Sequence, residues 1–236
     1  MNDLYQKLQL VGEQEDRAQI LAVLASIQQG RLKNDIKLLN FYREIPVSYE
    51  AGVLTVEESD AELQVHQVQA VVISFEKITV LKSSHFPRDV VAKVNYVNVE
   101  KSRIVLSNFS YAIVRADRRM SVRVQLTDPI YASFTSPAGN IGGRLHDMSL
   151  TGISFNVAQE PAIPLSEKGE LAVTLPIGTI TVPASLLKVL TIQDGYRMAF
   201  EIEVTRATEA SISQYLFRRQ VEIIKELKDH PGILPD

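Results

Sequence analysis

The chain has 236 residues, of which 45% are hydrophobic and 22% charged, and a formal net charge of −3. This composition is typical of a globular protein with one large domain or two of ordinary size. The lack of cysteine excludes thiol catalysis, disulfides and metal sites with sulfur ligands, and the small net charge argues against bulk binding of nucleic acid polymers. Since no apolar run approaches the ~18 residues of a membrane helix and the first residues lack signal-peptide features, we expect a cytoplasmic protein without direct membrane insertion.

The first half of the chain predicts one helix followed by a series of strands. Residues 13–29 place Ile20, Leu24 and Ile27 on one helical face, and Gly30 is a natural stop. The runs that follow are short, rich in β-branched residues and separated by turn residues, which is typical of a small antiparallel barrel or sandwich. The expected strands are 45–49, 53–57, 62–74, 77–82, 90–97 and 103–111.

The second half predicts another strand series and a closing helix. Turn residues at regular spacing favour a closed or nearly closed antiparallel barrel. The expected strands are 122–126, 130–135, 143–147, 153–157, 170–175, 179–190 and 196–202. A final helix over residues 209–228 has four apolar residues on one side: Ile212, Leu216, Ile223 and Leu227.

Positive charge is concentrated between the two strand series. Residues 101–125 contain six basic residues and one acidic residue, Asp117. Four of the basic residues are arginines close together: Arg115, Arg118, Arg119 and Arg123. A guanidinium offers a rigid fork of donors to phosphate and also stacks on a base, so this stretch predicts a local anionic partner. Taken alone, such a run is more often a solvated linker.

A second polar segment, Asp147-Met-Ser149-Leu-Thr-Gly152, begins 24 residues after Arg123. Its pattern predicts a strand, a tight turn and a strand. Asp147 and Ser149 would present short polar groups, while Gly152 permits a close backbone approach or a positive φ. Taken alone, this segment is an ordinary turn.

No set of residues in the sequence predicts catalysis or a metal site. The four histidines lack the spacing of metal ligands. The sequence contains neither a glycine-rich phosphate loop nor a nucleophile motif with a base and an orienting group. We therefore expect the protein not to be an enzyme and to need no cofactor or metal.

Together, in this order and spacing, the two polar segments resemble the PilZ domain, whose hallmarks are Arg-x-x-x-Arg and (Asp/Asn)-x-Ser-x-x-Gly. Arg119 and Arg123 match the first hallmark, and Asp147, Ser149 and Gly152 match the second. The resemblance runs from residue 115 to about residue 228 and includes the late strand over 195–200 and the closing helix. It implies a six-stranded barrel that binds the bacterial second messenger cyclic di-GMP.

The first half is similar, in architecture and length, to the N-terminal barrel of YcgR-type flagellar brake proteins, in which the arginine motif lies on the connector between two barrels. The resemblance implies a mostly β protein of two antiparallel barrels, a YcgR-like split barrel and a PilZ barrel, with a helix near each terminus. The implied domains are residues 1–112, an arginine-rich connector at 113–124, and residues 125–236. Ligand binding would fix the angle between the barrels and regulate a partner, with the flagellar motor or switch at the basal body as the leading one.

The ligand residues implied by the resemblance are Arg118, Arg119, Arg123, Asp147, Ser149 and Gly152, with Arg115 as a possible addition. Arginine forks suit phosphate oxygens or the O6/N7 edge of guanine, and the Asp147 carboxylate can accept from guanine N1–H and N2–H. Arg115 and Arg118 add charge beyond the minimal motif. We therefore expect two molecules of cyclic di-GMP per chain, because a self-associated pair brings four phosphates together.

Two other interpretations stay open. The first is a PilZ-fold adaptor that binds protein without dependence on nucleotide, although such adaptors usually lose the motif residues. The second is an RNA-binding barrel, which would require aromatic residues among the basic ones, and residues 114–124 contain none. The sequence leaves both a monomer and a homodimer open.

Overall fold

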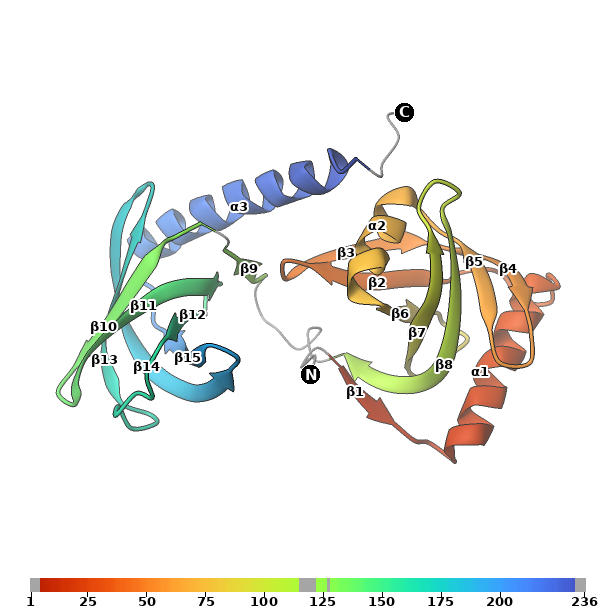
Figure 1. Ribbon diagram of the computed structural model, residues 1–236, viewed down its shortest axis with the longest axis horizontal. Helices are drawn as coiled ribbons and strands as arrows, with labels where there is room; N and C mark the ends of the chain where they lie inside the picture. The colour runs from red at the N-terminus through yellow and green to blue at the C-terminus, as the bar shows by residue number, and fades with distance from the viewer. Residues whose placement is uncertain (1–4, 115–121, 127, 232–236) are drawn as a thin grey trace. The chain divides into compact units, whose positions relative to one another are not determined.

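The computed structural model describes residues 5–114, 122–126 and 128–231 (Figure 1). Internal contacts divide the chain into unit 1, which comprises Met1–Tyr42, Pro46–Arg119 and Lys225–Asp236, and unit 2, which comprises Arg43–Ile45 and Met120–Ile224. Each unit has its own sheet and is described by itself. Within the described ranges, no helix combines the length and the apolar character needed to cross a membrane.

Unit 1 is built on an eight-stranded sheet (Figure 1). Its strands are β1 (Tyr5–Leu8), β2 (Lys37–Tyr42), β3 (Ile45–Glu50), β4 (Gly52–Val56), β5 (Ala61–Gln64), β6 (Ile78–Lys82), β7 (Asp89–Asn98) and β8 (Arg103–Val114). They follow the order β3-β2-β6-β7-β8-β5-β4. Strand β8 is long enough to pair with β5 along its first residues and with β1 along its last. The sheet therefore curls into a half-barrel, in agreement with the expected split barrel.

Helix α1 (Glu13–Gln28) packs against unit 1 through the face that the sequence predicts. Ile20, Leu24 and Ile27 are buried in the main core of the unit. One further residue of the helix, Asp16, is only 2% exposed. Its carboxylate accepts hydrogen bonds from the backbone N–H groups of Leu10 at 2.8 Å and Val11 at 3.1 Å, which fixes the chain where it enters the helix.

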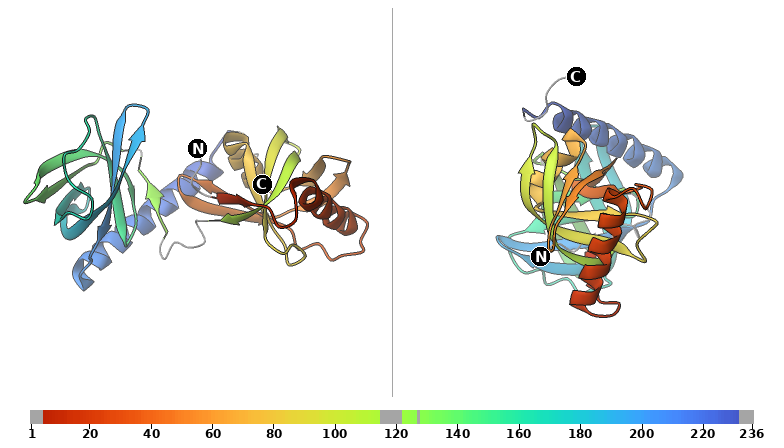
Figure 2. Two further views of the ribbon diagram at one scale, coloured as in Figure 1. Left: turned by 90° about the horizontal axis from the view of Figure 1, so that it is seen from below. Right: turned by 90° about the vertical axis from the view of Figure 1, so that its right-hand side faces the viewer.

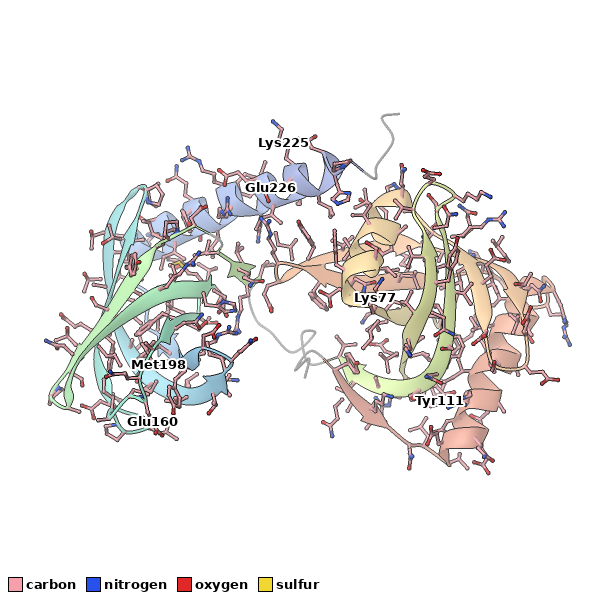
Figure 3. The ribbon with its side chains drawn as sticks, in the orientation of Figure 1. Lys77, Tyr111, Glu160, Met198, Lys225 and Glu226 are labelled. Atoms are coloured by element: carbon pink, nitrogen blue, oxygen red, sulfur yellow. The ribbon has the colours of Figure 1, made fainter. Side chains whose placement is uncertain are left out.

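The expected strand over 62–74 is wrong beyond residue 64. Strand β5 ends there, and helix α2 (Gln67–Glu76) follows. The ring of His66 accepts a hydrogen bond from the N–H of Val68, which caps the helix, and Lys77 ends it with a φ of 57° (Figure 3). Residues 68–73 are all buried. A short apolar run that is covered on every side has no amphipathic period, so its sequence resembles that of a buried strand.

Unit 2 is a closed six-stranded antiparallel barrel (Figures 1 and 2). Its strands are β9 (Val124–Gln125), β10 (Tyr131–Ser136), β11 (Gly139–Met148), β12 (Gly152–Val157), β13 (Lys168–Leu175), β14 (Gly178–Ile192) and β15 (Gly195–Ile202). The order is β10-β13-β14-β15-β12-β11, and pairing between β10 and β11 closes the ring. Strand β9 is added at the end of β11. The expected barrel is confirmed.

The inside of the barrel is filled by aromatic and aliphatic side chains. The ring centroid of Phe200 lies 4.7 Å from that of Phe134 and 5.1 Å from that of Phe155, and all three residues are at most 1% exposed. Met198, which Figure 3 labels on unit 2, is also fully buried. Since successive residues of a strand face opposite sides of the sheet, Arg197 lies on the outer face of the barrel.

Helix α3 (Arg206–Lys228) closes the described chain. It begins three residues earlier than the sequence predicts and ends at the predicted residue. All four residues of its expected apolar side are buried: Ile212, Leu216, Ile223 and Leu227.

Candidate functional site

Asp147 is the centre of a polar cluster on the barrel of unit 2. It lies near the end of β11, where the pairing register with β12 shifts between Leu145 and Asp147. The Asp147 side chain is nearly buried, and its Oδ2 accepts a hydrogen bond of 2.8 Å from the Ser154 hydroxyl on β12. Because one oxygen is fixed by Ser154, the carboxylate has a defined orientation, and its other oxygen remains available to a donor.

Strand β9 brings Arg123 to this carboxylate. Gln125 pairs with Asp147 and Val124 with Met148, so the register places Arg123 beside the end of β11. The Nε of Arg123 lies 3.5 Å from Oδ1 of Asp147, and 36% of the arginine side chain is exposed. This Nε is buried without a hydrogen-bond partner. The sequence motifs predict that both residues belong to one site, and the structure brings them together.

Ser149 and Gly152 form the tight turn that the sequence predicts. The N–H of Ser149 donates to the carbonyl of Gly152 at 2.8 Å, and its hydroxyl donates to the same carbonyl at 3.2 Å. Ser149 is only 2% exposed. Its hydroxyl therefore holds the turn in this structure. A Cβ at Gly152 would lie 3.1 Å from the carbonyl oxygen of Phe200, a close backbone approach that favours glycine at this position.

Comparison with known proteins assigns this part of the chain to a family. Residues 117–218 match the model of the PilZ domain family. These residues form a PilZ domain. The match covers the barrel, the Asp147 turn and the first half of α3.

Several solved structures are similar to the chain at low sequence identity. They include the complex of K. pneumonia MrkH with c-di-GMP, with 15% identity, a TM-score of 0.48 and coverage of 89% of this chain and 96% of that chain. Escherichia coli YcgR in complex with c-di-GMP has 15% identity, a TM-score of 0.44 and coverage of 88% and 92%. The Bacillus subtilis inhibitor of motility MotI/DgrA has 14% identity, a TM-score of 0.43 and coverage of 79% and 95%. The comparison with curated protein sequences finds no match.

The structure describes four of the seven expected ligand residues of the PilZ domain and its connector. Arg123 lies beside β9 and Asp147 on β11. Ser149 lies in the turn after β11, and Gly152 begins β12. The other three expected residues, Arg115, Arg118 and Arg119, lie outside the described residues.

Two polar residues on the outer face of the PilZ domain join the cluster without being predicted by the sequence motifs. The first is Arg197 on β15, which donates from Nε to Oδ1 of Asn156 on β12 at 3.0 Å. Burial lowers the pKa of Arg197, and the nearby Asp147 carboxylate acts in the opposite direction. Arg197 directly precedes the buried Met198 on β15. The alternation of polar and apolar residues in a strand could therefore have predicted that Arg197 lies on the outer face. Its closeness to Asp147 depends on strands that are distant in sequence.

The second of these residues, His146, precedes Asp147 and extends the cluster. Its Nε2 lies 3.9 Å from Oδ2 of Asp147. Burial lowers the pKa of His146, and the positive charge of Arg197 lowers it further, although Asp147 acts in the opposite direction. The imidazole is therefore neutral at neutral pH, and the fixed cations around the carboxylate are the two arginines, which stay charged.

This arrangement is suited to binding a ligand that carries both anionic groups and hydrogen-bond donors. Arg123 and Arg197 can bind acceptors, and Asp147 can bind donors. Among the residues that the structure describes, no cluster of histidine and acidic residues could hold a metal ion.

Proposed function

We propose that the protein is a cyclic di-GMP receptor that acts by binding rather than by catalysis. The observation that carries this proposal is the pairing of Arg123 with Asp147 at the end of β11, inside the residues that match the PilZ domain family. Both residues belong to the hallmark motifs. The ligand presents two phosphates and two guanines, so its receptor needs cations and an acceptor for the base.

The charges of the site match this ligand. A guanidinium can hold a phosphate through two charge-assisted hydrogen bonds, or bind the O6 and N7 of guanine with the same fork. Arg119 and Arg123 are the residues that we assign to these contacts. Part of the Arg123 side chain is exposed and its Nε makes no hydrogen bond, so the guanidinium is available to a ligand. Asp147 would accept from guanine N1–H and N2–H, with Ser149 and Gly152 shaping the turn beside the base.

We further propose the domain division 1–112, 113–124 and 125–236, with the arginine-rich connector as the segment on which ligand acts. Like charges in a connector repel one another, and a bound dianion would draw them together. Binding would then fix the angle between the two domains, which is a hinge switch of a recognised kind. The change would present a different composite surface to a partner.

Flagellar motility is our leading proposal for the regulated process, because the two-domain layout resembles that of YcgR-type brake proteins. In this proposal the partner is a motor or switch protein at the basal body. The alternative of a nucleotide-independent adaptor is less favoured, because Arg119, Arg123, Asp147, Ser149 and Gly152 are all present.

Calorimetric titration of the full chain tests the proposed function. Cyclic di-GMP should release or absorb heat in a saturable titration, whereas GTP and a short single-stranded RNA should give no saturable signal. A chain that binds none of the three would support the adaptor, and preference for the RNA would contradict the nucleotide site.

The hinge gives a separate prediction. Cyclic di-GMP should change distances between the units and leave distances within each unit unchanged. Pairs of spin labels at exposed positions, Arg88 in unit 1 and Glu160 in unit 2, would measure the first kind of distance. A second pair within unit 2, at Glu160 and Arg218, is the control. Identical distance distributions with and without saturating ligand would exclude the hinge while leaving the binding site intact.

A further inference from the structure

On the outer face of the PilZ domain, two neighbouring rows of paired residues bring polar side chains close together. Directly paired residues of adjacent strands face the same side of a sheet. Asp147 pairs with Ser154, and Ser154 pairs with Ala199 on β15. Asn156 and Arg197 pair with each other one step along the same two strands, two residues from Ser154 and Ala199. Arg197 therefore lies on the same face as Asp147, in the adjacent row.

The contacts of Arg197 leave one side of its guanidinium available. Asn156 binds the Nε–H at 3.0 Å and so fixes the plane of the group. The structure describes no hydrogen bond from Nη1 or Nη2 of Arg197 to any residue within the described ranges. The side chain is half-buried. Two parallel N–H donors on an oriented, partly desolvated cation form the fork that binds two adjacent acceptors.

The neighbouring carboxylate determines which acceptors fit this fork best. Asp147 lies close enough to Arg197 to act on the pKa of its guanidinium, so this face presents an acceptor beside the donors of the fork. A guanine presents donors at N1 and N2 and acceptors at O6 and N7. A carboxylate beside a guanidinium has the complementary pattern. Adenine has an acceptor at N1 and a donor at N6, which would oppose both residues.

We propose that Arg197 reads the O6/N7 edge of the guanine whose N1–H and N2–H donate to Asp147, and that Asn156 is a positioning residue that holds its guanidinium. This inference rests on the proposed function and adds to it the residue that selects guanine. In this proposal, residues on β11 and β15 of the barrel select guanine over adenine. The connector arginines then serve chiefly the phosphates and the remaining guanine.

The test is calorimetry of the full chain with three ligands, namely cyclic di-GMP, its analogue with 7-deazaguanine bases and cyclic di-AMP. Arg197→Gln removes the cation, and Arg218→Gln on the exposed face of α3 is the matched control with the same loss of charge. Arg197→Gln should weaken cyclic di-GMP binding about tenfold and should change cyclic di-AMP binding much less. The wild type should lose affinity on removal of N7, whereas Arg197→Gln should lose markedly less. Asn156→Ala should lower the preference for cyclic di-GMP over cyclic di-AMP in the same direction as Arg197→Gln.

The outcomes separate this inference from the function on which it rests. No binding of cyclic di-GMP by the wild type contradicts the proposed function. Wild-type binding with an unchanged affinity in Arg197→Gln contradicts the role of Arg197 alone. Equal loss of affinity for all three ligands, or the same N7 effect in wild type and variant, would mean that Arg197 contributes only general positive charge, which also overturns the proposal.

Discussion

Replacing Arg123 by alanine is expected to weaken cyclic di-GMP binding at least tenfold without unfolding the PilZ domain. The variant removes a charge-assisted contact to the ligand, and the loss of about 1.5–3 kcal/mol that is typical of such contacts corresponds to a factor of roughly 10 to 150 in affinity. In the structure Arg123 makes a 3.5 Å contact to Asp147 and keeps 36% of its side chain exposed. Asp147 retains its hydrogen bond to Ser154 in the variant, so stability should change little.

Calorimetry and thermal unfolding of the same preparations check this prediction. Arg119→Ala is expected to give a similar loss of affinity, since it removes the other hallmark arginine. Arg103→Ala is the matched control, because this arginine is exposed on β8 of unit 1, where it pairs with Glu62. Wild-type affinity in folded Arg123→Ala would remove this residue from the ligand site. An equal loss in Arg103→Ala would indicate a non-specific effect of charge.

The number of ligand molecules is expected to fall from two to one when Arg118 is replaced by leucine. Cyclic di-GMP can associate as two interleaved molecules with stacked guanines, which brings four phosphates close together. A site that holds the pair needs more positive charge than a site that holds one molecule. Arg118 directly precedes the hallmark Arg119, and Arg115 lies three residues upstream of Arg118, so the connector has two cations beyond the motif.

Calorimetric stoichiometry with a known concentration of active protein measures this effect. The wild type should bind two molecules per chain and Arg118→Leu one, whereas Arg103→Leu should keep the wild-type value. A stoichiometry of one in both the wild type and Arg118→Leu would contradict the prediction. Two molecules in both would assign the second ligand to cations other than Arg118.

The sequence predicts those parts of the fold whose determinants are local. The faces of α1 and α3 follow from apolar residues at helical spacing, and residues such as Ile20, Leu24, Ile212 and Leu216 are buried as expected. The turn after β11 follows from the positions of short polar residues and a glycine. These signals lie within one element, so the sequence of that element is enough to read them.

The errors occur where tertiary burial decides the structure. Helix α2 is surrounded by apolar neighbours, and its valine-rich sequence predicts a strand. Strands β1 and β2 do not follow from the sequence pattern. Strand β2 contains Asn40, whose Oδ1 accepts hydrogen bonds of 2.7 Å from both Gln69 and Thr79. A polar residue in a buried strand breaks the apolar pattern, and its partners lie on α2 and β6, far along the sequence.

The site shows the same division. The hallmark residues Asp147 and Arg123 could be found because they occur in two short motifs, and the resemblance connects these motifs. The hydroxyl of Ser149 bonds within its own turn in this structure, and its place at the ligand stays a prediction. Arg197 could not be linked to Asp147 from sequence, because its position depends on the pairing of β12 with both β11 and β15.

Backbone amide spectra of the full, isotope-labelled chain, recorded during titration with cyclic di-GMP, test the central claim most directly. We predict that the largest shifts fall on Arg123, on residues 147–152 and on Arg197, and that these shifts saturate together. The buried residues of unit 1, such as Ile73 and Leu81, should keep their positions in the spectrum. Saturable shifts confined to unit 1, with residues 147–152 unchanged, would contradict a cyclic di-GMP site on the PilZ domain.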